Sequence, residues 1–440
     1  MELAVSVAVL LGALLLLLFV AFGKGKTELN EKSESTEITD DLPAAQEHDD
    51  TPYPTEEPEQ LQLPHVEELE QHSFSHPLLA ATLHGHYGNV TCLDFSSNGK
   101  YLVSCSDDCT IRIWSTKDFL SSEHQCLRVA IEKDHASLVS LSPDSRTFIT
   151  WLAGKKTLRV FQMCKENDSS FSFKPAPEDF PRLHTATVVN IGIAETGTFI
   201  MTACSNATII LWDLYGKLLA SIDTNQTTSL YAAISPCGRF VASCGRNVKV
   251  WEVCFTTDGQ FKEVVRAFDL QGHSSPVQFF AFSGDSCRMV TLSRDGTWKL
   301  WDTDVDYEEQ QDPYLLRTVS CQVSENSRIA LSPDARVVAV SNGCGMTLYN
   351  TTSGELEEEF HDVQSEDIVD LAFDINSRFL ACSGGRAIRV FHNAPGYRAA
   401  IQDMEAMLQK TSNEDMQRRL QQQIQDAQDA LDNLFAEAKS

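Results

Sequence analysis

Short apolar runs that end in an aromatic residue recur through the middle of the chain. They read TIRIW, TLRVF, TIILW, VKVW, TWKLW, MTLY and AIRVF, and end at Trp114, Phe161, Trp212, Trp251, Trp301, Tyr349 and Phe391. Such runs, rich in β-branched and aromatic residues, predict strands. Their spacing of 39 to 51 residues is typical of β-propeller blades. The seven runs therefore predict an all-β, seven-bladed propeller over residues 72–395.

The last run ends the third strand of its blade, so the fourth strand must come from elsewhere in the chain. The segment FSHPLLAAT, residues 74–82, precedes the first blade and can supply it. Pairing the two ends of the ring would remove an exposed sheet edge and close the propeller. We expect deletion of this segment to destabilise the whole ring.

Polar residues recur at fixed offsets before three of the aromatic positions. The three sets are His86, Ser104, Asp108 and Trp114; His184, Thr202, Asn206 and Trp212; and His273, Thr291, Asp295 and Trp301. Their residue types are those of a hydrolase triad. Three copies in register favour a structural role, because a nucleophile is needed once whereas a fold constraint recurs in each blade. The sets resemble the hydrogen-bonded tetrads of the WD40-repeat family.

An uncharged stretch from Leu3 to Phe22 is long enough to cross a bilayer. A cleaved signal peptide has a shorter apolar region, of roughly 7 to 15 residues, behind a basic start. This chain has Glu2 at its start, and Lys24 and Lys26 follow the stretch. We therefore predict a transmembrane signal anchor at residues 1–23, with the rest of the chain in the cytosol by the positive-inside rule.

The formal net charge of -27 is concentrated after this stretch. Between Thr27 and Gln71 there are fifteen Asp or Glu residues, one Lys and five prolines. Such a composition predicts a disordered acidic linker over residues 24–71, because too little apolar surface is available to offset the ordering entropy. A solvated spacer and an acidic docking motif for a basic partner are both compatible with it.

The chemistry-bearing motifs of common enzymes are absent from the sequence. There is no P-loop, no GxGxxG after a strand, no HExxH and no CxxC pair, and the thirteen cysteines fall singly in apolar runs. We expect buried reduced thiols, no catalytic residue, no cofactor and no metal. An acidic propeller also disfavours general nucleic-acid binding. The remaining class is an interaction platform.

A helical pattern replaces the strand pattern in residues 396–440. YRAAIQDMEAMLQK predicts one amphipathic helix, and Thr411 or Ser412 can cap a second. In the second helix apolar residues recur at heptad spacing, at Leu420, Ile424, Ala427, Leu431 and Leu434. Two alternatives remain: packing on the first helix or the propeller, and a short coiled coil with a second copy or a partner.

Longer motifs add a more specific resemblance. FSSNGKYL, TIRIWSTKDFL, PEDFP, SPCGRFVASCG, VKVWEVCF and GTWKLWDTDV are similar to the transducin beta-like branch of the WD40-repeat family. The resemblance implies a single-pass endoplasmic reticulum membrane protein with a cytosolic propeller. It also implies binding to the stress-sensing kinase of translation initiation factor 2 alpha in the unfolded protein response, and ribosome or RNA contacts. The acidic linker departs from the pattern, since mammalian members are rich in Lys and Arg there.

Two other functional classes remain as alternatives. One is a reticulum-bound nucleotide-exchange propeller for a vesicle-budding GTPase, and the other is an enzyme whose catalytic acid or base lies outside the tetrads. The sequence does not select the partner-binding residues. Loop aromatics are the first candidates to consider, namely Trp151, Phe180, Tyr307 and Tyr314.

Overall fold

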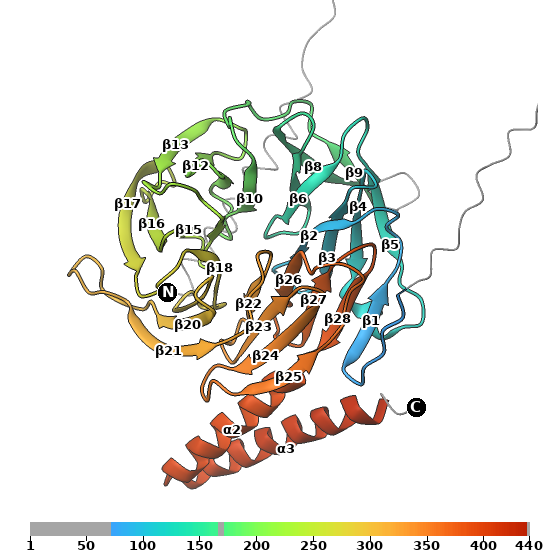
Figure 1. The fold of residues 1–440 in the computed structure, drawn as a ribbon, viewed down its shortest axis with the longest axis vertical. Coiled ribbons are helices and arrows are strands. Elements are labelled where there is room, and N and C mark those ends of the chain that lie inside the picture. Colours follow the sequence, from blue (N-terminus) through green and yellow to red (C-terminus); the bar gives the residue numbers. More distant parts are fainter. Residues whose placement is uncertain (1–71, 166–170, 438–440) are drawn as a thin grey trace, which may run out of the picture. The chain divides into compact units, whose positions relative to one another are not determined.

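A computed structural model describes residues 72–165 and 171–437, which form a closed β-propeller followed by two helices (Figure 1). Seven antiparallel sheets of four strands each surround a central axis. This confirms the predicted fold class and the number of blades. The predicted membrane anchor and acidic linker lie outside the described residues. Within the described ranges, no helix is both long and apolar enough to cross a membrane.

The first four blades follow the chain from the axis to the rim. Blade 1 contains β2 (Val90–Phe95), β3 (Tyr101–Ser106), β4 (Thr110–Ser115) and β5 (Cys126–Ala130), with the 3₁₀ helix η1 (Thr116–Leu120) after β4. Blade 2 contains β6 (Ala136–Leu141), β7 (Thr147–Leu152), β8 (Thr157–Lys165) and β9 (Phe171–Pro175). Blade 3 contains β10 (Val188–Ile193), β11 (Ile200–Cys204), β12 (Thr208–Trp212) and β13 (Leu218–Asp223). Blade 4 contains β14 (Tyr231–Ile234), β15 (Phe240–Cys244), β16 (Val248–Phe255) and β17 (Phe261–Leu270).

The last three blades return the chain to its starting point. Blade 5 contains β18 (Val277–Phe282), β19 (Arg288–Ser293), β20 (Thr297–Asp302) and β21 (Tyr314–Ser320). Blade 6 contains β22 (Ile329–Leu331), β23 (Val337–Asn342), β24 (Gly345–Asn350) and β25 (Leu356–Phe360). Blade 7 contains β26 (Asp370–Phe373), β27 (Phe379–Ser383), β28 (Ile388–His392) and, as its outer strand, β1 (Leu79–Leu83).

Strand β1 closes the ring, as the sequence predicted. It pairs antiparallel with β28, so that Leu79 lies opposite Phe391 and Leu83 opposite Ile388. Leu83 is fully buried. The buried Arg389 adds a polar tie, because its guanidinium donates to the carbonyl of His72 at 2.7 Å. The two ends of the propeller are therefore joined by strand pairing, apolar packing and a side-chain hydrogen bond.

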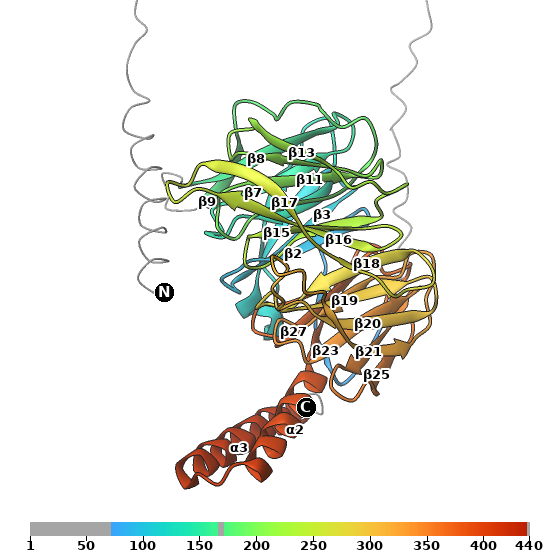
Figure 2. The same ribbon diagram turned by 90° about the vertical axis from the view of Figure 1, so that its left-hand side faces the viewer.

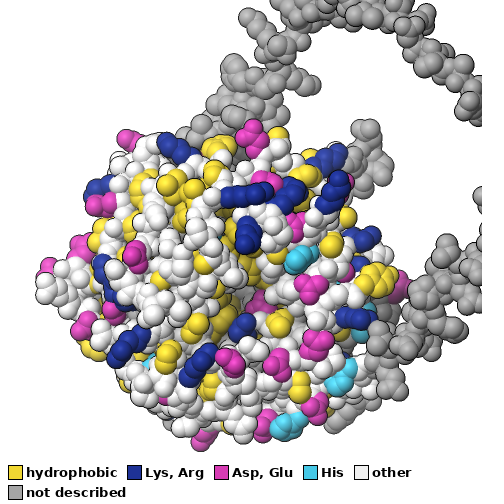
Figure 3. Space-filling view, turned by 45° about the horizontal axis from the view of Figure 1, so that its top comes forward, with side chains coloured by type: hydrophobic (Ala, Val, Ile, Leu, Met, Phe, Trp, Pro, Cys, Tyr) yellow, Lys and Arg dark blue, Asp and Glu magenta, His cyan; other side chains and the backbone are white. Residues whose placement is uncertain are grey.

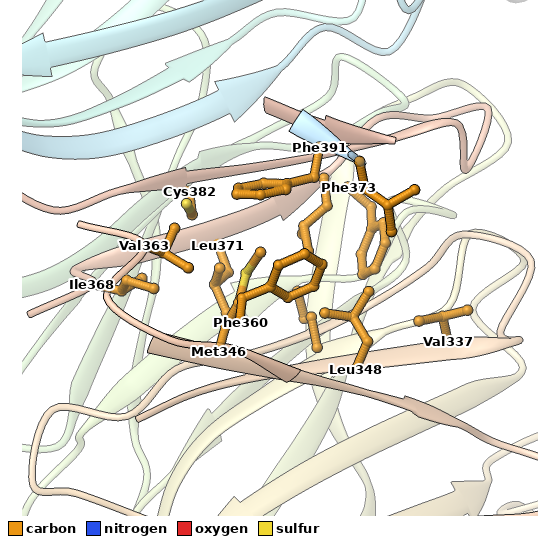
Figure 4. Packing of buried hydrophobic residues seen from close by; sticks show 14 of the residues in the cluster. Val337, Met346, Leu348, Phe360, Val363, Ile368, Leu371, Phe373, Cys382 and Phe391 are labelled. Atoms are coloured by element: carbon orange, nitrogen blue, oxygen red, sulfur yellow. The ribbon is translucent and has the colours of Figure 1, made fainter. Parts of the chain in front are cut away.

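The hydrophobic core is divided into clusters between neighbouring blades. In the cluster between blades 6 and 7, Met346 and Leu348 from β24 point toward Leu371 and Phe391 of blade 7 (Figure 4). The rings of Phe360 and Phe391 lie 4.9 Å apart between their centroids. Because blades bury both faces against their neighbours, the middle strands are nearly continuous in apolar or small residues.

The carboxyl-terminal segment forms a helical hairpin of α2 (Ala394–Lys410) and α3 (Glu414–Glu437), which projects beyond the propeller (Figure 2). Asn393 caps α2, so the helical part begins two residues before the predicted boundary. Asn413 caps α3, because its side chain accepts the N–H groups of Asp415 and Met416. The predicted caps Thr411 and Ser412 are therefore wrong; Thr411 instead ends α2.

The hairpin packs on itself and on the propeller. The heptad residues of α3 are buried or half-buried, and Leu431 packs against the core cluster between blades 6 and 7. Arg336 of blade 6 pairs with Asp403 of α2 at 2.9 Å, and Arg398 of α2 pairs with Glu357 of β25 at 3.0 Å. The apolar seam is thus used within the chain, which favours the first of the two alternatives for this segment.

Candidate functional site

The polar set of blade 1 forms a continuous chain of hydrogen bonds. The indole N–H of Trp114 donates to the Ser104 hydroxyl at 2.9 Å, and that hydroxyl lies 2.8 Å from Nε2 of His86. Nδ1 of His86 lies 3.0 Å from the carboxylate of Asp108. Burial lowers the pKa of His86, so the ring is neutral at pH 7. A neutral ring that accepts from Ser104 and donates to Asp108 satisfies every group in the chain.

Blade 5 repeats this arrangement with a threonine as the hydroxyl group. Trp301 Nε1 donates to Thr291 at 3.0 Å, Thr291 lies 2.8 Å from His273 Nε2, and His273 Nδ1 lies 2.9 Å from Asp295. Burial opposes ionisation of Asp295, but hydrogen bonds from Thr297, His273 and the Ser274 N–H outweigh it. Together they lower the pKa of Asp295 to about 2. Trp301 and Asp302 close β20, so this tryptophan–aspartate pair belongs to the architecture.

Blade 3 requires a correction to the sequence-based assignment. Trp212 donates to Thr202 at 2.8 Å and Thr202 lies 2.6 Å from His184, as in the other two sets. The thiol of Cys204 then takes the place of the carboxylate, 3.0 Å from His184 Nδ1, and it donates to Asn206 Oδ1. Burial lowers the pKa of His184 to about 4. Asn206 is therefore linked to His184 through Cys204.

In all three sets the hydroxyl group is hydrogen-bonded within the set. The hydroxyls of Ser104, Thr202 and Thr291 each accept an indole N–H and contact an imidazole nitrogen. All three residues are fully buried. A nucleophile needs a substrate within reach, whereas these hydroxyls are enclosed between strands. The sets brace each blade by joining its second and third strands to the loop that enters it.

Blade 2 has a brace that the sequence reasoning missed. The buried carboxylate of Asp134 accepts three backbone N–H groups at 2.8 Å, from His135, Gly154 and Lys155. These bonds lower its pKa despite the desolvation by burial. Asp134 lies in the entry loop and not in the turn where the offset predicts a carboxylate, so a search at fixed spacing cannot find it.

Side chains of opposite charge are unevenly distributed over the face of the propeller that Figure 3 shows. In the space-filling view, Lys and Arg side chains gather over the upper part of the face, and Asp and Glu side chains are more frequent at the lower right (Figure 3). The exposed Lys133 and Lys156 belong to the loops braced by Asp134. The overall acidic charge therefore coexists with a local basic region.

A channel of about 390 Å³ lies along the propeller axis, lined by the innermost strands. Asp370 of β26 accepts the N–H of Leu93 at 2.8 Å, and Asp94 of β2 accepts the N–H of Leu141 at 2.7 Å. Each carboxylate thus links its blade to the next. Deep burial raises the pKa of Asp94 to about 7 and that of Asp370 to about 6. These two aspartates do not lie at the sequence offsets that define the tetrads, and no sequence signal identified them.

The described residues contain no grouping of three or more His, Cys, Asp or Glu side chains that could hold a metal ion. The thirteen cysteines are free thiols, and five of them are buried. Burial raises the pKa of Cys244 and Cys382 to about 12, so both are protonated at pH 7. The expectation of buried thiols therefore holds for five cysteines, while the other eight are half-buried or exposed.

Four aromatics were predicted to lie in loops, and this is wrong for two of them, because Trp151 lies in β7 and Tyr314 in β21. Trp151 and Phe180 are buried, and Phe180 packs against Trp212. Tyr307 is half-buried and donates to Glu252 at 2.6 Å. Only Tyr314 is strongly exposed, at 61 %. Three of these candidates therefore pack against core clusters of the propeller, and Tyr314 remains available to a partner.

Comparison with known proteins agrees with this architecture. The family model described as "WD domain, G-beta repeat" matches residues 78–115 and 263–302, which include the two complete tetrads. Transducin beta-like protein 2 of Mus musculus is 56% identical over 374 residues, covering 84% of this chain and 85% of that protein. The human protein of the same name is 51% identical over 440 residues, covering 98% of this chain and 97% of that protein. This chain therefore belongs to the transducin beta-like protein 2 family of WD40-repeat proteins.

Proposed function

We propose that this protein is a scaffold anchored in the endoplasmic reticulum membrane, with its propeller in the cytosol. One observation supports the scaffold role: the side chains of the three tetrads, which resemble catalytic groups, are buried and stabilise the blades of a closed ring. Such a ring presents loops on two faces at fixed separations, and this is what a docking platform requires. Family membership supports the same class, since WD40 propellers generally mediate protein interactions.

The anchor and its orientation rest on the sequence. Leu3–Phe22 is uncharged, and Lys24 and Lys26 follow it, which favours a cytosolic carboxyl side. The Thr27–Gln71 segment can serve as an acidic tether between the bilayer and the propeller. The localisation follows from the family resemblance and not from the described residues.

The partner that the resemblance favours is the stress-sensing kinase of translation initiation factor 2 alpha, acting in the unfolded protein response. We assign this contact to the propeller and not to the linker, because the acidic linker of this chain differs from the basic linkers of mammalian relatives. A partner that binds a basic linker would not bind the acidic linker of this chain, whereas a partner that binds the propeller would be unaffected by the charge of the linker.

The test compares three forms of the full-length protein in cells under reticulum stress. These are the wild type, a form in which Leu3–Phe22 is replaced by an unrelated membrane anchor, and a form without residues 1–23. We expect kinase recovery with the first two and its loss with the third, because anchoring concentrates both proteins at one membrane. Equal recovery of the kinase by all three forms, or recovery by none, would refute the proposal.

A further inference from the structure

The outer strand of each blade has one edge without a neighbour, and proteins commonly guard such edges with charged side chains or cover them. Strands β5, β9, β13, β17 and β25 each carry at least one charged residue. Strand β1 has none, but its Leu79 packs against the core cluster that also contacts α3. Five edges are thus charged and one is covered.

Strand β21 is different from these six. Tyr314, Leu315 and Leu316 are consecutive and expose 61 %, 47 % and 45 % of their surface. The strand's one charged residue, Arg317, reaches away to blade 6, where its guanidinium donates to Ser353 at 2.9 Å and to Thr352. In both ribbon views β21 lies at the rim, and α2 contacts the neighbouring blade (Figures 1 and 2).

The pairing of β21 with β20 contains a bulge at the leucines. Leu315 pairs with Trp301 and Arg317 with Leu300, so Leu316 is an extra residue without a partner on β20. With side chains of about 200 Å² each, the three apolar residues expose on the order of 300 Å² of surface. Apolar patches of this size on soluble proteins are often functional.

An acidic loop lies directly before this apolar strand. Asp304, Asp306, Glu308, Glu309 and Asp312 are all exposed, and none has an ion-pair partner among the described residues. The loop is held in place, because Tyr307 donates to Glu252 at 2.6 Å and the N–H of Gln311 donates to the carbonyl of Asp306 at 3.1 Å. A fixed acidic rim therefore borders the apolar residues.

We propose that Tyr314–Leu316 and the acidic loop 304–312 form a docking surface for a partner segment with apolar residues next to Lys or Arg. The apolar side chains would bury against the leucines, and the basic ones would meet the loop carboxylates. The charge disfavours anionic lipid and nucleic acid. It also disfavours a second copy, since the whole chain carries a net charge of -27. The proposal rests on the scaffold function and names one of its surfaces.

The test measures binding of the full-length protein to a fluorescent synthetic peptide of alternating Val and Lys. We expect the double variant Leu315→Ser/Leu316→Ser to weaken binding about tenfold. The variant Glu308→Gln/Glu309→Gln/Asp312→Asn should weaken binding and reduce its dependence on salt. The matched control is Leu356→Ser on β25, because Leu356 is a leucine of similar exposure, 52 %, on the next outer strand.

Four outcomes would overturn the proposal: unchanged affinity in the double variant, an equal loss with Leu356→Ser, equally tight binding of a Val–Glu peptide, and binding of phosphatidylserine vesicles through the same leucines. A fifth outcome, self-association that the double variant abolishes, would also overturn the proposal and assign the surface to a second copy. The result is separable from the kinase experiment. Peptide binding can depend on Leu315 and Leu316 whether or not the kinase is recovered.

Discussion

Replacing Asp295 by Asn tests whether the tetrads stabilise the ring through charge. The carboxylate side chain of Asp295 is 10% exposed and accepts hydrogen bonds from Thr297, Ser274 N–H and His273. Its pKa is about 2 in the folded protein and 3.8 ordinarily. Each unit of pKa difference corresponds to 1.36 kcal/mol, so the ionised group contributes about 2 kcal/mol to folding at neutral pH.

The sign of the pH dependence follows from the lowered pKa. A carboxylate that is more acidic in the folded state stabilises the fold above its unfolded pKa, and this stabilisation is lost as the pH falls toward about 2. About half of it should be gone by pH 3. Asn cannot carry the charge, so Asp295→Asn should lower the free energy of unfolding by about 2 kcal/mol at pH 7 and by less at pH 3.

The assay is urea unfolding followed by tryptophan fluorescence at several pH values between 7 and 3. Asp302→Asn is the matched control, because Asp302 ends β20, the strand that follows the Asp295 turn, and its carboxylate accepts the N–H of Asp304 at 3.1 Å. Its effect should stay within about 0.5 kcal/mol. A difference between wild type and Asp295→Asn that does not change with pH would refute the argument, since the loss would then come from packing.

Three further predictions concern the closure, the blade 2 brace and the hairpin. Deleting residues 74–83 removes β1 and should lower the melting temperature of the whole ring; an unchanged melting curve would contradict closure by this strand. Asp134→Ala leaves three backbone N–H groups without an acceptor and should cost about 2 to 4 kcal/mol in urea unfolding, whereas the exposed Glu132→Ala should cost little. Arg398→Ala should speed amide hydrogen exchange in α2 relative to the wild type, while exchange in blade 2 stays unchanged. If α2 exchanges at the same rate in the variant and the wild type, the ion pairs do not hold the hairpin.

The sequence determined the repeat, the number of blades and the closing strand. These features are local or periodic: an apolar run forms a strand wherever it lies, and a period near 40 to 50 residues leaves few architectures. It also placed the two complete tetrads correctly, because His273, Thr291, Asp295 and Trp301 all lie in the entry loop and first three strands of one blade, whose lengths fix the offsets.

Only the tertiary structure decided which groups meet when their contacts depend on more than one hairpin. Cys204 replaces Asn206 beside His184, Asp134 braces from an entry loop, and Asp94 and Asp370 each join two adjacent blades. Likewise the exposed leucines of β21 are distinguished from buried ones only after the blades are stacked. The physical reason is that strand formation depends on neighbours along the chain, whereas burial and hydrogen bonding depend on residues brought together by the closed ring.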